Sequence, residues 1–434
     1  MRGAPLRMLV LIMTHGNNTI EHPGELNAGE KRPRLRRRLT LPLLVLYGLG
    51  VTIGAGIYVL VGTTAGRAGI YAPSAFVVAA VVMALTAASF AELSGRYPVS
   101  AGEAAYVRAG FRSDLIAIFT GLLVILAGIV SSAAISIGST GYIRELIDLP
   151  QNVLVPMVVL AMGAVAAWGI LESVLFAAFF TVIEAGGLIA IIVLGFGSDP
   201  DLVTRLPDVL PPLSEPGVWS GIASAGLLAF FAFIGFEDLV NVAEETRNPK
   251  KTMPWAIFLT LAMSTVIYFL VASIAVLTVP PDQLAASPAP LNDVFRQVTD
   301  APPAVILGIA VVATLNTIIV QIIMASRVVY GLADQGNLPA VFARINAVTR
   351  TPLVATSSVI AVILVLALAF PLEGLAEMTS RITLTVFALV NIALIKLKLA
   401  GDPAPDGVFV VPLWVPVAGV LACTAFLMSG YLVG

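Results

Sequence analysis

Residues 48–58 read Gly-Leu-Gly-Val-Thr-Ile-Gly-Ala-Gly-Ile-Tyr and lie in a segment otherwise apolar enough to cross a bilayer. Each glycine inside a helix costs roughly 1 kcal/mol relative to alanine, so the four glycines together remove about 4 kcal/mol of helix preference. The stretch therefore predicts a helix that breaks within the membrane. Unwound backbone at membrane depth persists only where it faces protein or a water-filled cavity. A polar cavity near the bilayer midplane follows, and such a cavity indicates transport.

The composition places the whole chain in the membrane. Of 434 residues, 58% are hydrophobic and 12% are charged, and the mean hydropathy is +0.97. A soluble domain carries about twice that charged fraction. Both histidines, His15 and His22, lie near the N-terminus, and the only cysteine is Cys423. We therefore expect no metal centre, no Ser-His-Asp triad, no disulfide framework and no cofactor in the membrane part, and no enzyme.

A basic run at residues 31–38 ends a polar N-terminal stretch and comes directly before the first apolar segment. No convincing signal-peptide core or cleavage site precedes it. We therefore expect residues 1–40 to form an uncleaved cytosolic tail and residues 41–434 to form the transmembrane unit. Runs of about 20 apolar residues, long enough to cross a bilayer, predict eleven spans near residues 41–63, 71–95, 114–138, 152–171, 173–197, 218–245, 254–279, 303–333, 353–371, 374–399 and 410–432.

The distribution of basic residues predicts the orientation. With a cytosolic N-terminus, most of the 24 Lys and Arg lie in the tail and the cytosolic connections. This asymmetry follows the positive-inside rule. We expect a multi-pass protein of the cell (inner) membrane, with its N-terminus in the cytosol and the lipid bilayer rather than nucleic acid around it. The outer connections carry at most five basic residues, which are Arg67, Arg144, Arg205, Arg296 and Arg381.

The sixth expected span is interrupted as well. Residues 230–238 read Phe-Phe-Ala-Phe-Ile-Gly-Phe-Glu-Asp, so a glycine and two acids come where a lipid-facing helix should continue. Breaks in spans one and six are typical of an inverted-repeat transporter whose site lies between the repeats. We predict an all-α membrane fold with 5+5 repeats, at about residues 41–197 and 218–399, followed by an extra helix at about residues 410–432.

The ends of broken helices offer binding groups for a zwitterion. Unpaired N–H groups and helix dipoles at one half-helix suit a carboxylate, and unpaired C=O groups at the other accept hydrogen bonds from an ammonium group. Two plainer explanations stay open: close helix packing by the glycines and bulky lining by the aromatic residues. The predicted substrate-binding residues are Ile53, Gly54, Ala55 and Gly56 in the first break and Phe231, Ala232, Phe233 and Ile234 in the second.

Several motifs carry a resemblance to a known family. Besides the two breaks, they are Ala-Glu-Leu at 91–93, Arg-Tyr-Pro at 96–98, Glu-Glu-Thr-Arg-Asn-Pro at 244–249 and Asp-Gln-Gly-Asn-Leu-Pro at 334–339. On these residues the chain resembles the amino acid-polyamine-organocation (APC) permeases over spans one to ten. Within that superfamily it is most similar to bacterial homologues of cationic amino acid transporters, and also to proton-coupled broad-specificity permeases. The resemblance implies an amino acid substrate.

The chain departs from that family at three points. The family usually has twelve spans, whereas eleven are expected here. Ala333 stands where many relatives have arginine. Some proton-coupled relatives have a lysine near the position of Glu184, where its charge stands in for a sodium ion between helices one and eight. A carboxylate cannot replace that cation, but it can bind or release a proton or attract a cation.

Four residues are candidates for coupling or gating. Glu184 lies in an apolar span, where an ionised acid costs about 3 kcal/mol or more, so it is either a protonatable coupling group or a neutral structural acid. Glu237, next to Asp238, is expected to link or gate the second half-helix rather than contact the substrate amine. Asn316 and Thr317 either face the cation position beside helix one or make a structural hydrogen bond.

These observations predict a secondary active transporter of L-amino acids that works by proton-coupled symport and alternating access. A neutral side chain is favoured because the deep acids Glu184, Glu237 and Asp238 are not clearly placed for a cationic one. Sodium coupling, exchange of amino acids or polyamines, and cationic amino acid transport stay open. A non-transporting sensor is disfavoured by the short tail, and a membrane hydrolase by the lack of a buried His or paired Asp in the spans.

Overall fold

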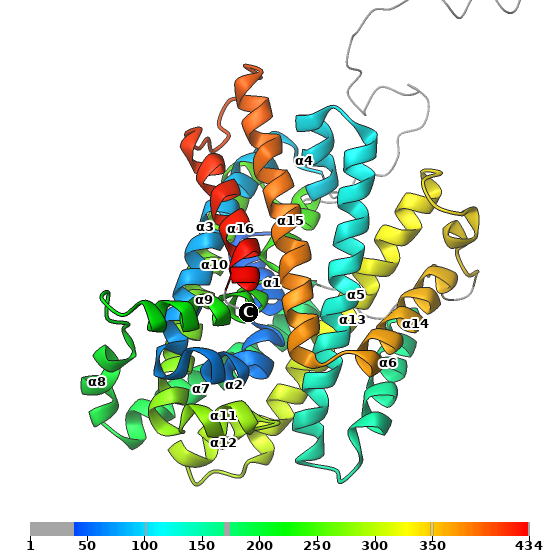
Figure 1. Cartoon of the computed structure of the whole chain (residues 1–434). Helices are drawn as coiled ribbons and strands as arrows, with labels where there is room; N and C mark the ends of the chain where they lie inside the picture. Colours follow the sequence, from blue (N-terminus) through cyan, green and yellow to red (C-terminus); the bar gives the residue numbers. More distant parts are fainter. Residues whose placement is uncertain (1–38, 100–101, 169–173, 348, 350, 433–434) are drawn as a thin grey trace, which may run out of the picture. The chain divides into compact units, whose positions relative to one another are not determined.

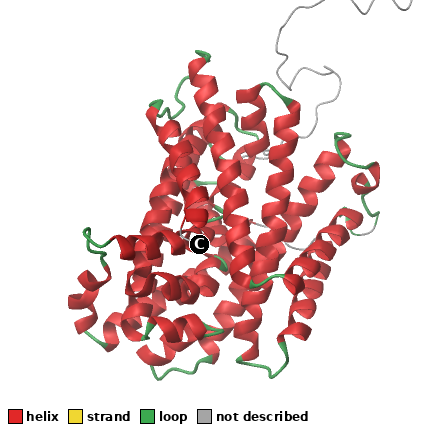
Figure 2. Ribbon diagram, in the orientation of Figure 1, coloured by secondary structure: helices red, strands yellow, loops and turns green. Residues whose placement is uncertain are grey.

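The structure, a computed structural model, describes residues 39–99, 102–168, 174–347, 349 and 351–432. The predicted tail at residues 1–40 therefore lies outside the described residues except at its last two positions. Every regular element of the described part is a helix, joined by loops (Figure 2). The helices are α1 (Leu41–Ile53), α2 (Gly56–Ala68), η1 (Gly69–Tyr71), α3 (Ala72–Arg96), α4 (Gly102–Phe111), α5 (Asp114–Arg144), α6 (Gln151–Trp168), α7 (Val174–Ser198), α8 (Asp201–Arg205), η2 (Leu206–Val209), α9 (Pro216–Phe231), η3 (Phe236–Glu245), α10 (Pro249–Thr278), α11 (Pro281–Ala286), α12 (Pro290–Val298), α13 (Ala304–Asp334), η4 (Ala340–Ala343), α14 (Leu353–Ala369), α15 (Leu372–Leu399) and α16 (Trp414–Leu432).

The helices agree with the predicted spans. Within the described part, eight helical stretches are long and apolar enough to cross a membrane, and three shorter apolar helices accompany them. The short ones are α1, α14 and α16, and α1 with α2 makes up the first predicted span. Each of the other predicted spans contains one helix, which is the shorter α14 in the ninth span and α16 in the eleventh, except that the sixth span contains α9 followed by η3. The all-α, multi-span fold class is confirmed.

The first span breaks inside the glycine run. The helix α1 ends at Ile53, Gly54 leaves helical geometry with φ −12° and ψ −103°, and α2 begins at Gly56. Glycine at position 56 also permits a close approach, since a Cβ there would lie 2.4 Å from the Cα of Ala232. The two predicted breaks therefore contact each other.

The sixth span breaks at Gly235. This residue has φ +125°, a conformation that L side chains rarely adopt, and a Cβ there would lie 2.7 Å from the carbonyl oxygen of Val51. Glycine is therefore needed for both its backbone angle and its contact with α1. Beyond the break the chain continues as the tighter 3₁₀ helix η3 rather than as an α-helix.

Long helices surround the two breaks (Figure 1). The helix α3 packs along α10 and α5 packs along α13, while α15 also lies against α5. In the predicted numbering, each of the first two pairs joins the same position of the two repeats. The repeat boundaries themselves stay a prediction. Ahead of α1, the backbone of Leu39 bonds to Glu245 and Arg247, which ties the start of the first span to the end of the sixth.

Candidate functional site

One hydroxyl group lies against both breaks. The Tyr268 side chain of α10 is fully buried, and its oxygen lies 2.7 Å from the carbonyl oxygen of Thr52 and 2.8 Å from that of Ala232. These carbonyls belong to the ends of α1 and α9, where helix termini leave acceptors without an intrahelical partner. The hydroxyl has a single proton, so it donates to one carbonyl at a time. Tyr268 thereby holds the two broken helices together, a role that the sequence analysis missed.

The predicted substrate-binding residues gather around this contact. Those of the first break are buried, with Ile53 fully covered and Ala55 2% exposed. In the second break the carbonyl of Phe231 already accepts the Ile234 N–H in a turn. Ile234 is half-buried and lines a cavity. Binding of substrate at these eight residues stays a prediction.

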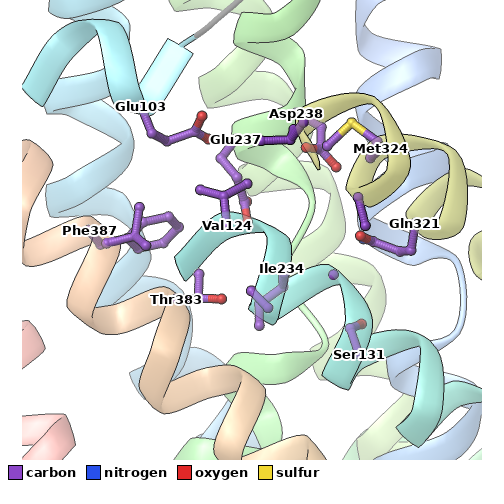
Figure 3. Close-up of a pocket in the computed structure, with 15 residues that line it drawn as sticks. Glu103, Val124, Ser131, Ile234, Glu237, Asp238, Gln321, Met324, Thr383 and Phe387 are labelled. Carbon is purple, nitrogen blue, oxygen red and sulfur yellow. The ribbon is translucent and has the colours of Figure 1, made fainter. Parts of the chain in front are cut away.

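The cavity beside the second break has a volume of about 40 Å³ and lies between η3, α4, α5, α13 and α15. Figure 3 shows three acidic side chains gathered at one end and Ile234, Ser131 and Thr383 toward the other. The walls between them are largely apolar. The apolar lining residues include Ile234, Val124, Met324 and Phe387, and the neutral polar ones include Ser131, Gln321 and Thr383.

The acidic cluster consists of Glu103, Glu237 and Asp238. Glu103 and Asp238 are 6% and 5% exposed. Glu237 accepts a hydrogen bond from the backbone N–H of Gly235 at 2.9 Å, and Asp238 accepts one from the Asn241 amide at 3.4 Å. The described residues that line the cavity include no Lys, Arg or His. Three buried carboxyls therefore border one cavity next to a helix break.

Glu103 was not among the predicted site residues. It stands in the first turn of α4, and its burial raises its pKa to about 7. The signal in the sequence is a single acid within the small, apolar run Ala-Gly-Glu-Ala-Ala-Tyr-Val at residues 101–107. That signal shows an unusual acid but not its neighbours, because α4 and η3 come together only in the fold.

The other predicted coupling residues lie at a separate place. Glu184 of α7 is fully buried, and one of its carboxyl oxygens accepts a hydrogen bond from the Asn316 amide of α13 at 3.2 Å. Its second oxygen, Oε2, has no hydrogen-bond partner among the described residues. The Tyr58 hydroxyl of α2 donates to the Glu184 carbonyl at 2.7 Å. The structure thus brings Glu184 and Asn316 together but leaves Glu237 in the acidic cluster.

A small cavity of about 20 Å³ lies between α1, α7 and α13. Asn316 and Thr317 line it, together with Gly50 and Thr181. Thr317 lies against the first break, since a Cβ on Gly54 would be 2.2 Å from its hydroxyl. That hydroxyl donates to the Ala313 carbonyl in its own helix. Both residues therefore face the first span beside its break.

A larger cavity of about 630 Å³ opens between α2, α5, α6 and α14 and is bordered by the segment between α11 and α12. Its polar lining includes Thr63, Arg144 and Asn152. An acidic cavity thus lies beside the second break, and a larger, more open cavity is lined by α2, the helix that follows the first break.

The family to which the chain belongs is identified by a match over nearly all of the predicted transmembrane unit. The model of a family described as "Amino acid permease" matches residues 39–433. The chain belongs to this family. Its relatives include the branched-chain amino acid permease BcaP of Bacillus subtilis, 30% identical over 89% of this chain and 86% of the relative. The methylthioribose transporter of the same organism is 27% identical over 93% and 90%, respectively.

This amino acid permease is also similar to a plant protein, the vacuolar cationic amino acid transporter 2 of Arabidopsis thaliana. The two are 30% identical over 84% of this chain and 60% of the relative. The resemblance to APC permeases is thereby confirmed. The names of these relatives include a branched-chain, a cationic and a sugar-derived substrate. Family membership therefore supports amino acid transport in a membrane but leaves open the chemistry of the side chain.

Proposed function

We propose that this amino acid permease is a proton-coupled symporter of L-amino acids in the cell membrane, with its N-terminus in the cytosol. Substrate binds between the two helix breaks, and rocking of the surrounding helices exposes the site alternately to each side. The observation that supports coupling is the geometry of Glu184. Its carboxyl lies next to the first broken span with one oxygen hydrogen-bonded to Asn316 and the other without a partner.

The physical reason is the cost of a lone charge in an apolar span. An ionised carboxylate there costs about 3 kcal/mol or more unless a cation or donors compensate it. A single amide donor compensates it in part. Protonation removes the charge. When the two sides of the membrane differ in pH, Glu184 is protonated more often while the site faces the acidic side. A proton that binds from one side and leaves to the other then moves with the substrate.

Uptake of labelled L-amino acids into proteoliposomes tests this proposal. The arms are an imposed proton gradient, an imposed sodium gradient and internal substrate alone. We expect acid outside to stimulate uptake, and Glu184→Gln to abolish that stimulation while substrate binding survives. Asn316→Ala is the matched control, because it removes the hydrogen bond but keeps the titratable carboxyl, so stimulation by acid should persist.

Three results would contradict proton symport. Flux that needs internal substrate and ignores pH would make the protein an exchanger, with Glu184 as a structural acid. Stimulation by sodium alone would assign the coupling to that ion. Absence of both uptake and exchange, with substrate binding intact, would favour a sensor.

The side-chain preference depends on other acids than Glu184. The prediction of a neutral side chain depended on acids that were not clearly placed for a cationic one. In the structure, Glu237 and Asp238 are joined by Glu103 around one cavity at the second break. This arrangement favours the cationic alternative.

A further inference from the structure

We propose that α16, which lies outside the two predicted repeats, is fastened to α3 together with the C-terminal half of α15, and that the three move as one rigid unit during transport. The same unit holds the second helix break. The proposal rests on the alternating access proposed above and adds which helices travel together. It depends on buried polar contacts that lie away from Glu184 and from the acidic cluster.

The first fastening is a buried hydrogen-bond network between the three helices. The side-chain amide of Asn391 on α15 accepts a hydrogen bond from the Ser89 hydroxyl of α3 at 2.6 Å and donates one to the Thr86 hydroxyl of α3 at 2.9 Å. The Thr86 oxygen lies 3.7 Å from the sulfur of Cys423 on α16, and all four side chains are fully buried. Gly419 of α16 leaves room for the amide, since a Cβ there would lie 2.7 Å from its oxygen. Such hydrogen bonds join apolar helices in a membrane, where no water replaces a lost partner.

The second fastening is a buried charge cluster at the C-terminal ends of α3 and α15. Glu92 of α3 is fully buried, and one of its oxygens accepts hydrogen bonds from Arg96 of α3 and Lys398 of α15, both at 2.9 Å. Its other oxygen accepts the backbone N–H of Val411, shortly before α16, at 2.8 Å. Removing one partner from a buried ion pair is strongly unfavourable. The ends of the three helices therefore stay joined.

The segment between α15 and α16, residues 400–413, is bonded to α3 and α10 as well. The Arg96 guanidinium donates to the carbonyl of Asp402 at 3.0 Å, and the Lys250 ammonium of α10 donates to that of Asp406 at 2.9 Å. The segment thus ties the start of α16 to the end of α3 and the start of α10. It also gives a structural role to the sequence motif that contains Arg96, which the transport site does not use.

Aromatic rings connect this unit to the second break. Phe236, the first residue after Gly235, contacts Phe90 of α3 and Phe387 of α15 edge to face, with ring centroids 5.8 and 5.5 Å apart. Phe90 and Phe387 also contact each other, at 5.5 Å. Closely packed interiors move as units rather than deforming continuously. Movement of the second break therefore carries α3 and α15 with it, and α16 follows through the two fastenings.

The interface between α15 and α5 is the expected boundary of the unit. These helices pack against each other, but the acidic cavity opens between them, and Val124 of α5 and Thr383 of α15 both line it. The Thr383 hydroxyl has no hydrogen-bond partner among the described residues. The face of α15 toward α3 has a closed polar network, whereas the face toward α5 has a cavity and an unused hydroxyl. Sliding is therefore expected against α5.

A disulfide between α3 and α16 tests whether they move together. Thr86→Cys places a second sulfur beside Cys423, where the present side-chain atoms lie 3.7 Å apart. We expect the oxidised variant, with its disulfide quantified by mass spectrometry, to take up amino acids into proteoliposomes at a rate within about twofold of that of the reduced variant, because the bond crosses no moving interface.

The matched control joins a helix of the first break to α5. It is Val59→Cys with Gly138→Cys in a Cys423→Ser background, at positions where the two Cβ atoms would lie 3.0 Å apart. Oxidation of this pair should lower uptake at least about tenfold, since α2 must move relative to α5 for the site to open. A fall of the same size on oxidation of Thr86→Cys, reversed by reduction, would overturn the proposal.

Spin-label distances provide a second measurement that needs neither the disulfide nor transport. Labels at Val81→Cys of α3 and Leu421→Cys of α16, both on exposed side chains, should give the same distance distribution with and without a mixture of L-amino acids. Labels at Val81→Cys and Leu122→Cys of α5 should give a shifted one. Both pairs are made in a Cys423→Ser background.

The two measurements separate this proposal from the transport function. A shift in the pair on α3 and α16, or no shift in either pair, would overturn the rigid moving unit. If Thr86→Cys does not fold or does not form its disulfide, the spin labels decide the question. Absence of uptake by the reduced protein would count against transport alone, and the spin labels would still decide whether α16 moves with α3.

Discussion

Arg67, near the end of α2, bonds to Glu377 of α15 at 2.5 Å, and its other terminal nitrogen lies 2.9 Å from Glu373 of the same helix. This contact links the second half of the broken first span to the tenth predicted span. Thr63, one turn before Arg67, lines the large cavity. The ion pair therefore lies where movement of α2 away from α15 would widen that cavity.

We expect Glu377→Gln to weaken this contact and increase access to the cavity. A partly exposed ion pair contributes about 0.5–1 kcal/mol, which corresponds to a two- to fivefold change in the open population. The measurement is the labelling rate of Thr63→Cys by an impermeant maleimide, in a Cys423→Ser background. Glu145→Gln breaks the pair between Glu145, just after α5, and Arg296 of α12 and should leave the rate unchanged. Equal rates in all three proteins would show that the contact does not restrain α2.

The Tyr268 hydroxyl gives a second prediction. Tyr268→Phe should lower stability by about 1–3 kcal/mol, because two buried carbonyls lose their shared donor. It should also slow transport, since no hydroxyl then lies between the carbonyls of the two breaks. Tyr142→Phe is the matched control: its hydroxyl bonds to the Tyr58 carbonyl, beyond the first break. Thermal unfolding should show comparable losses for both variants, whereas the uptake rate should fall for Tyr268→Phe only. The same uptake defect in both would contradict a special role at the breaks.

Gly235 gives a third prediction, on stability. Gly235→Ala places a Cβ 2.7 Å from the Val51 carbonyl oxygen at φ +125°. Strain of this kind costs on the order of 1–3 kcal/mol, so the melting temperature in detergent should fall clearly. Gly308→Ala, in the second turn of α13, meets nothing within 4 Å and should be neutral or slightly stabilising. An unchanged melting temperature for Gly235→Ala would show that the second break differs from the one described.

The fourth prediction concerns pH. Burial raises the pKa of Glu103 from 4.5 to about 7. Between these values the folded protein holds a proton that the unfolded chain has released, so the Glu103 contribution is complete below about pH 4.5 and is lost as the pH rises to about 7. The size is on the order of 3 kcal/mol, at about 1.4 kcal/mol per pH unit. Without ligand, the melting temperature should fall across this window, and Glu103→Gln should flatten the curve relative to Glu145→Gln. Parallel curves would place the Glu103 titration outside this range.

Local chemistry made the helical fold predictable. Glycine weakens a helix wherever it stands, so the sequence indicates where the breaks at Gly54 and Gly235 can form, although Gly186 and Gly187 stay helical in α7. Runs of apolar residues of bilayer length similarly predict the spans, because each helix must satisfy its own backbone hydrogen bonds in lipid. The agreement of predicted and observed helices therefore needs no knowledge of tertiary packing.

Which of the candidate residues contact each other could be learned only from the fold. Glu184 could be recognised as a costly acid from its apolar neighbours, and Asn316 as a candidate beside it, but their hydrogen bond joins α7 to α13. Tyr268 gave no local signal, since a tyrosine in a span is ordinary, and its role comes from the two carbonyls that reach it.

The acidic cluster, too, could be found only from the tertiary structure. The sequence contains Glu103, Glu237 and Asp238 but separates the first from the others by most of the first repeat. A side chain's electrostatic environment is set by groups within a few ångströms, whatever their distance along the chain. Only the packing of α4, η3, α13 and α15 puts the three carboxyls around one cavity. The sequence therefore determined the spans and the two breaks, while tertiary contacts decided which charges lie together at the second break.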